Sequence, residues 1–232
     1  IFFSHDKETT TPAYYEVTTQ KNITEISSTL RCGIMRFTML YDDSLYLLMM
    51  PNSDQSQGFI RIDAAKGAVW GYNPVHRIYQ GWGQPAGFSG YFVVRVKKAF
   101  ETPGVFDEKE IIKADQIKEM PGIGAYAGWK LKKGEQLIVR AGTSFTSIEE
   151  AEKNLEAEIP SADFEKVKDQ SAVIWGKALH RIEIKDTSEV NKSIFYTAFY
   201  HTMQQPRLFS DADGSYPAFA HQYKIAQLPD GK

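Results

Sequence analysis

The stretch "EQLIVRAGTSFTSIEEAEKNLEAEIP", Glu135 to Pro160, changes its periodicity halfway along. Up to about Ser144 it is rich in β-branched residues and glycine, as a strand with its turn would be. From Ser147, which has the spacing of a capping box with Glu150, the pattern is that of a helix that Pro160 ends. The sequence therefore predicts that a β domain ends here and that a helical segment begins.

Short segments that favour β-strands fill the chain from Tyr14 to this point. They are rich in β-branched and aromatic residues, mostly alternate polar with apolar residues, and are separated by turn clusters. The segments read "YYEVTT", "ITEISSTLRCGIMRFTML", "SLYLLMM", "GFIRID", "AVWGY", "YFVVRVKKAF" and "EQLIVRAGTSF". Several short strands at this spacing predict an antiparallel β-sandwich.

Two stretches within this region depart from simple alternation. "LYLLMM", Leu45 to Met50, is apolar throughout, so we expect a strand that is covered on both faces. "GIGAYAG", Gly122 to Gly128, has the glycines of a nucleotide-binding loop but neither the strand-to-helix context nor the following lysine. We interpret it as an ordinary loop.

Two further helices are predicted after Pro160. The first runs from about Ala162 to Ile182, and the second begins at a capping box formed by Asp186 and Glu189. The apolar stripe of the first comprises Phe164, Val167, Ser171, Ile174, Trp175, Ala178, Leu179 and Ile182, and the second is expected to carry Val190, Ile194, Phe195, Ala198 and Phe199 inward. Because so few helices cannot enclose a core of their own, we expect the chain to be a piece of a larger protein.

Composition excludes several kinds of partner. The 232 residues are 42% hydrophobic and 24% charged, which is ordinary for a soluble protein with a sizeable core. The net charge is −2 and like charges form no block, which argues against nucleic acid and anionic membranes. The longest apolar run is too short to cross a bilayer. The single cysteine, Cys32, cannot form an intrachain disulfide, and its place in an alternating segment predicts a small buried apolar side chain.

The stretch "FYHTMQQPRLFSDADGSY", Phe199 to Tyr216, holds the densest group of polar candidates. Asp211 and Asp213 are spaced as calcium ligands can be, but the downstream glutamate of an EF-hand loop is missing. As an acid and base pair they are poorly placed, since neighbours in one turn seldom face each other across a sugar ring. A turn closed by side-chain to backbone hydrogen bonds, or a carboxylate that holds a sugar hydroxyl, are the remaining interpretations.

The histidines and the aromatic residues offer weaker candidates. His201 shares a helical face with Ile194 and Ala198, where a packing role is commoner than a ligand role. No two histidines have metal-ligand spacing, so zinc is not expected. The segment "YQGWGQPAGFSGYF", which contains Trp82, suits either a stacking surface for sugars or a hairpin corner.

Four motifs, in order and spread over nearly the whole chain, resemble glycoside hydrolase family 92. These are "FSHDKETTTPAYYEVTT", "ITEISSTLRCGIMRFTM", "VRAGTSFTSIEEAEKNLEAEIPSADFEKVKDQSAVIWGKAL" and "FYTAFYHTMQQPRLFSDADGSY". The second keeps the family's Glu25, Arg31, Gly33 and Arg36. Members of this family are exo-acting α-mannosidases, abundant in gut Bacteroidetes.

The resemblance implies a mainly β fold with α-helices: an antiparallel β-supersandwich, a helical linker and the beginning of an (α/α)6 barrel. The corresponding domains would be residues 1–146, 147–185 and 186–232. It also implies that the complete protein removes terminal α-linked mannose from glycans by an inverting, calcium-assisted reaction. A periplasmic, secreted or cell-surface location follows in the same way.

The resemblance places most of the chemistry outside this chain. No catalytic residue and no metal ligand is expected within it, so the chain alone should be inactive. Asp211, Asp213 and His201 are the expected substrate-binding residues, with Asp211 preferred because the family tolerates asparagine at the other aspartate. The expected partners are a mannose-containing glycan and the rest of the polypeptide. A non-catalytic carbohydrate-binding module and a purely structural sandwich are the alternatives.

Overall fold

A computed structural model describes residues 3–51, 57–76, 85–205, 207–218 and 224–229. Trp82, part of the predicted stacking segment, lies outside the described residues. The elements in chain order are β1 (Phe3–Thr11), β2 (Tyr14–Thr19), β3 (Asn22–Ser28), β4 (Cys32–Met39), β5 (Asp43–Met49), β6 (Phe59–Asp63), β7 (Ala68–His76), β8 (Pro85–Val96), β9 (Thr102–Phe106), β10 (Ile111–Ile112), β11 (Gln116–Lys118), β12 (Gly124–Leu131), β13 (Gln136–Ser144), α1 (Ile148–Glu158), α2 (Phe164–Leu179), α3 (Glu189–Thr202), β14 (Ser215–Pro217) and β15 (Ile225–Gln227).

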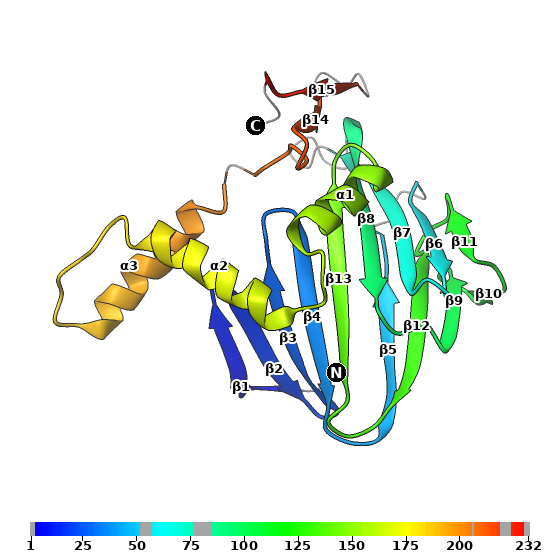
Figure 1. Cartoon of the computed structure of the whole chain (residues 1–232), viewed down its shortest axis with the longest axis horizontal. Helices are drawn as coiled ribbons and strands as arrows, with labels where there is room; N and C mark the ends of the chain where they lie inside the picture. The colour runs from blue at the N-terminus through cyan, green and yellow to red at the C-terminus, as the bar shows by residue number, and fades with distance from the viewer. Residues whose placement is uncertain (1–2, 52–56, 77–84, 206, 219–223, 230–232) are drawn as a thin grey trace.

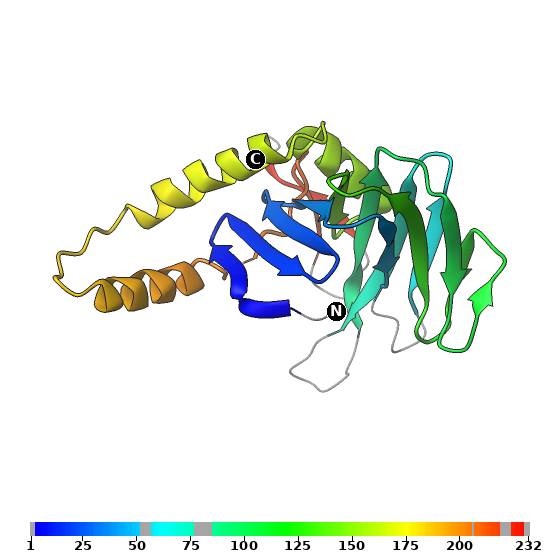
Figure 2. The ribbon, with the colours of Figure 1, turned by 90° about the horizontal axis from the view of Figure 1, so that it is seen from below.

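Two antiparallel sheets lie face to face and form a sandwich (Figures 1 and 2). The larger has nine strands in the order β1-β2-β3-β4-β13-β8-β7-β6-β11, and the smaller has four in the order β10-β9-β12-β5. Between them lies the main core, in which Trp129, Val105 and Val139 are fully buried. The Trp129 indole donates a hydrogen bond to the Ala99 carbonyl at 2.9 Å, which satisfies its one polar group. The predicted β-sandwich followed by helices is confirmed.

A helix layer covers the other face of the large sheet. α1 lies across β13 and β8 (Figure 1), where Ala151 and Leu155 pack against Ile34 and Val93. A Cβ added to Gly142 of β13 would run into the backbone of α1 and lie 2.8 Å from Leu155 Cβ. The glycine therefore allows α1 to pack closely on the sheet. Cys32 is buried in the same layer, as predicted.

The capping box predicted for α1 forms by half. Ser147 Oγ accepts a hydrogen bond from the Glu150 backbone N–H at 3.1 Å, so the helix starts where predicted. The Glu150 carboxylate does not return to Ser147; it pairs with Lys153 at 2.5 Å. The Ser147 N–H instead points to Ser144 Oγ at 3.4 Å.

The second and third helices form a hairpin that extends away from the sandwich (Figures 1 and 2). Only the first part of the predicted stripe on α2 is buried, where Phe164 and Val167 join the helix layer, whereas Ile174 is exposed. The prediction that α3 carries its apolar residues inward is wrong for this chain: Val190 and Ile194 are 68% and 64% exposed. α3 lies against α2, where the Trp175 and Tyr200 rings are 4.9 Å apart.

The start of α3 also differs from the prediction. Its N-cap is Ser188, which accepts from the Asn191 N–H at 3.3 Å. Asp186 lies before the helix and accepts from the Ser188 N–H at 2.7 Å and from the Asn191 side chain. None of the helices in the described part of the chain is long and apolar enough to span a membrane.

The two unusual stretches of the β region behave differently from prediction. "LYLLMM" belongs to β5, an edge strand of the small sheet, and its outer face is open: Tyr46 and Leu48 are 53% and 60% exposed. "GIGAYAG" is no loop, since Gly124–Leu131 form β12, which pairs with β5 on one side and β9 on the other. The boundaries predicted for the three domains stay predictions.

Candidate functional site

The predicted polar loop lies where α1 meets the end of β13. Residues 210–215 turn back on themselves: the Asp211 N–H donates to the Ser215 carbonyl at 2.8 Å, and the Gly214 N–H donates to the Asp211 carbonyl at 3.0 Å. Gly214 has φ of +87°, a conformation that glycine adopts without strain. The Asp-x-Asp-Gly turn expected from the sequence is therefore present.

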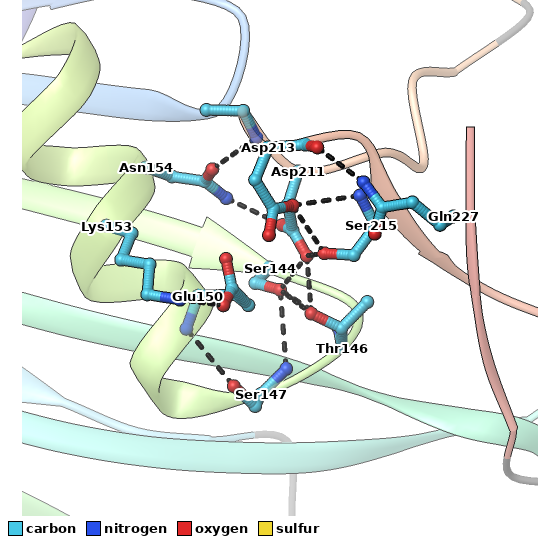
Figure 3. A network of polar contacts seen from close by, with 11 residues as sticks. Ser144, Thr146, Ser147, Glu150, Lys153, Asn154, Asp211, Asp213, Ser215 and Gln227 are labelled. Atoms are coloured by element: carbon cyan, nitrogen blue, oxygen red, sulfur yellow. Dashed lines mark hydrogen bonds and ion pairs between the residues drawn. The ribbon is translucent and has the colours of Figure 1, made fainter. Parts of the chain in front are cut away.

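Asp211 is the centre of this site, with only 3% of its surface exposed. Its Oδ2 accepts hydrogen bonds from Ser144 Oγ at 2.9 Å and from Thr146 Oγ1, and its Oδ1 accepts from Asn154 Nδ2 at 2.7 Å (Figure 3). Ser215 Oγ lies 3.4 Å from Oδ2. A buried carboxylate is stable only when such donors replace water, and three segments of the chain supply them.

Asn154 joins the helix to the loop. It is fully buried on the face of α1 that packs on the sheet. Its amide nitrogen donates to Asp211 and to the Thr143 carbonyl at 2.9 Å, and its oxygen accepts from the Ala212 N–H at 2.8 Å. One side chain therefore fixes both the aspartate and the backbone beside it.

Arg31 fixes the same loop from the other side. Its Nε donates to the Ser210 carbonyl at 2.6 Å, and its Nη2 donates to the Asp211 carbonyl at 3.2 Å. Its Nη1 pairs with Glu158 at 2.7 Å, and both side chains are mostly buried. Glu158 also accepts from Thr29 Oγ1 and from the Arg31 N–H. The loop is thus tied to the last turn of α1 and to the turn before β4.

A hollow of about 380 Å³ opens beside Asp211. Arg31, Arg207, Phe145 and Phe209 are among the residues that line it. The two phenylalanine rings lie 4.8 Å apart, and Phe88 packs edge-on against both. Aromatic faces beside guanidinium groups suit a ligand with apolar C–H faces and hydroxyl groups.

The other two predicted site residues, Asp213 and His201, are exposed. Asp213 Oδ1 accepts from the backbone N–H of Ser215 at 2.8 Å and from its hydroxyl at 2.6 Å. These hydrogen bonds hold the pKa of Asp213 below its ordinary value. His201 ends α3, its ring lies 5.7 Å from that of Tyr200, and it is not part of the loop's network.

The residues present do not fit a calcium ion. Both carboxylate oxygens of Asp211 already accept hydrogen bonds, and Oδ1 of Asp213 accepts from Ser215. Among the described residues no three histidine, cysteine, aspartate or glutamate side chains group as metal ligands.

Sequence reasoning selected the two aspartates but missed the groups that hold Asp211. Ser144 and Thr146 lie 67 and 65 residues before it, and Asn154 lies 57 residues before it. One signal pointed to Asn154, since it lies beside Leu155 and three residues after Ala151 on the buried face of the helix. A polar residue among core positions requires a partner.

Two family models match the chain. The model described as the glycosyl hydrolase family 92 N-terminal domain matches residues 2–144, and the family 92 catalytic domain model matches residues 150–229. No curated protein matches the chain.

Solved structures have the same fold. A family 92 inverting mannosidase from Bacteroides thetaiotaomicron has a TM-score of 0.85 at 23% identity, with 97% of this chain and 30% of that chain covered. A family 92 α-mannosidase from the same organism has a TM-score of 0.82 at 22% identity, with 98% and 31% covered. The latter is also solved in complex with mannoimidazole. The chain spans about a third of the length of these proteins. Because one family model covers most of its β-sandwich and the other covers its helices, the chain belongs to glycosyl hydrolase family 92.

Proposed function

We propose that the protein to which this chain belongs removes terminal α-linked mannose from glycans with inversion of configuration. The family match over both the sandwich and the helices carries this proposal. It is supported by relatives of the same fold that are described as an inverting mannosidase and an α-mannosidase, one of them bound to mannoimidazole. In such a reaction one carboxylic acid protonates the leaving oxygen while a second, separated carboxylate activates water.

We place that acid and base in the part of the protein beyond these residues. A general acid needs a raised pKa, and the pKa of Asp213 is lowered by its hydrogen bonds to Ser215. Asp211 is buried, and three side chains hold it. Purified alone, the 232-residue chain should leave α-1,2-mannobiose intact, and turnover above a blank would contradict this assignment.

The loop is proposed to form one wall of the mannose site. Asp213 is exposed and suited to accept a hydrogen bond from a sugar hydroxyl, and Arg207, which has no partner among the described residues, can donate one to a hydroxyl oxygen. Direct contact of mannose with Asp211 or His201 stays a prediction. If Asp211 acts by positioning the loop, Asp211→Asn in the full-length protein raises KM and lowers the thermal stability together. If it touches the sugar, the same change alters KM while stability stays near wild type.

Calcium is proposed to bind outside the described residues. EGTA should lower mannosidase activity of the full-length protein and leave the thermal unfolding of the 232-residue chain unchanged. A stabilising shift of this chain by calcium would contradict the proposal.

The location proposed for the protein is the periplasm, the cell surface or the medium. It rests on the family resemblance alone. Cell fractionation with an antibody to this chain tests it, and recovery in the cytoplasm would refute it.

A further inference from the structure

The outer face of the small sheet carries a repeated pairing of aromatic residues with glycines. Three cross-strand pairs connect β9, β12 and β5 on this face: Phe106 with Gly124, Tyr126 with Gly104, and Tyr46 with Gly128. The inner face of the same strands holds Ala125, Ala127 and Trp129, which are buried in the core. The aromatic residues are therefore all on the side that faces away from the sandwich.

Each aromatic ring lies over the glycine opposite it. A Cβ added to Gly104 would lie 2.5 Å from the nearest ring carbon of Tyr126, and one added to Gly128 would lie 2.5 Å from the ring of Tyr46. A Cβ on Gly124 would likewise run into the Phe106 ring. Since that Cβ points straight out from the sheet, rings at this position lie along the sheet surface. The outer part of each ring therefore covers the glycine opposite it.

The result is an aromatic surface, defined here as Tyr46, Phe106 and Tyr126. Tyr46 is 53% exposed, and Phe106 and Tyr126 are half-buried with their centroids 6.5 Å apart. A shallow hollow of about 580 Å³ covers these rings and the adjoining Leu48. Covering the glycines stabilises the sheet, but it leaves more than half of Tyr46 exposed.

The border of the hollow defines the charge of a suitable ligand. It is formed by the turn between β9 and β10, where Asp107, Glu108 and Glu110 accompany a single cation, Lys109. Asp107 is used within the turn, accepting from the N–H groups of Lys109 and Glu110 at 2.8 and 2.9 Å. The carboxylates of Glu108 and Glu110, which line the hollow, have no hydrogen-bond or ion-pair partner among the described residues. They can accept hydrogen bonds from hydroxyl groups, and they repel polyanions.

We propose that this aromatic surface binds neutral sugar residues of a polysaccharide. A pyranose ring has an apolar C–H face that matches an exposed aromatic face, and its hydroxyl groups reach the carboxylates at the border. The surface lies on the outer side of the small sheet, whereas α1 and the Asp211 loop lie beyond the large sheet (Figure 2). It is thus separate from the Asp211 site. Only the choice of mannan as first probe rests on the proposed function.

Affinity electrophoresis of the 232-residue chain tests the proposal. Gels would contain yeast α-mannan, galactomannan or xyloglucan, with polygalacturonate as the anionic comparison. We expect a neutral polysaccharide to retard the chain and polygalacturonate to have no effect. Tyr46→Leu, which keeps an apolar side chain over Gly128, should weaken the retardation about five- to tenfold. Tyr41→Ala is the matched control, because Tyr41 is 61% exposed but lies in the turn before β5, outside the surface.

Thermal unfolding of each variant distinguishes a loss of polysaccharide binding by the folded chain from a loss of the folded chain itself. Tyr126→Ala is the second variant, expected to bind as weakly as Tyr46→Leu at temperatures where both remain folded. The proposal is overturned if no neutral polysaccharide retards the wild-type chain, or if Tyr46→Leu is retarded like wild type. It is also overturned if the substitution only abolishes self-association. Binding of xyloglucan without mannan upholds the surface and leaves the mannosidase proposal to its own assay.

Discussion

Replacement of Asn154 by alanine should detach the Asp211 loop from the sandwich. The side chain is fully buried and makes three hydrogen bonds, to Asp211, to the Thr143 carbonyl and from the Ala212 N–H. A hydrogen bond to a charged group contributes about 1.5–3 kcal/mol, and a neutral one about 0.5–1.5 kcal/mol. The three together are worth about 2.5–6 kcal/mol.

The cost falls first on the loop. In Asn154→Ala the buried Asp211 Oδ1 loses its partner among the described residues, while Ser144 and Thr146 still hold Oδ2. Opening the loop to water relieves the unpaired oxygen without unfolding the sandwich. We therefore expect the Ala212 amide to exchange its hydrogen faster by a factor of a hundred or more, on the order of the lost free energy.

Native-state hydrogen exchange and urea unfolding measure the two parts of this effect. Asn191→Ala is the control, since Asn191 is exposed on α3 and, among the described residues, its side chain donates one hydrogen bond, to Asp186 at 3.0 Å. That control should stay within about 0.5 kcal/mol of wild type. A double-mutant cycle with Asp211→Ala should give a coupling of about 1.5–3 kcal/mol. If Asn154→Ala leaves Ala212 exchange unchanged and stability within about 1 kcal/mol, the reasoning is refuted.

Three further predictions follow from the helix layer. The Arg36 guanidinium pairs with the Glu25 carboxylate at 2.5 and 2.6 Å and lowers the pKa of Glu25 from its ordinary value of 4.5. Glu25→Gln should therefore destabilise the chain by about 1.5–3 kcal/mol at pH 7. Because the pKa of Glu25 is lower in the folded chain than in the unfolded chain, the stability difference between wild type and Glu25→Gln should be complete above pH 4.5. It should vanish as the pH falls through the pKa of Glu25 in the folded chain. A stability difference that does not depend on pH would contradict the pairing. Burial, with Glu158 nearby, raises the pKa of Cys32 to about 12, so Ellman's reagent at pH 8 should label the thiol only as fast as the chain unfolds in urea. Ser147→Ala should cost about 1 kcal/mol by urea unfolding and Ser147→Asp much less, and equal losses would disprove the capping role.

Local pattern predicted the parts of the fold that local forces decide. Alternation identified the paired strands β2, β3, β4 and β13, and the Ser147 cap placed the start of α1. The charged segment of β1 was missed because its side chains are almost all exposed and nothing in their order favours a strand. It is held by backbone pairing with β2, which the sequence of β1 alone does not encode.

The inward stripe predicted for α3 failed for a different reason. Periodicity identifies which residues of a helix share a face, and Val190 and Ile194 do share one. It does not identify what covers that face, because the covering element can lie anywhere in the protein. The same limit applies to the Asp211 site, where the aspartate was visible in a short motif and its donors were not.

The glycine-rich segment of β12 shows how a partner strand can reverse a local preference. Glycine weakens a strand because it loses more backbone entropy and offers no side chain to pack, so "GIGAYAG" reads as a loop on its own. In the sheet, Phe106 and Tyr46 from the two neighbouring strands supply the missing contacts at Gly124 and Gly128. The glycines in turn provide the space that those rings occupy. The glycines of β12 and the outward Tyr46 of β5 therefore depend on each other, and the aromatic surface forms because the two strands pair.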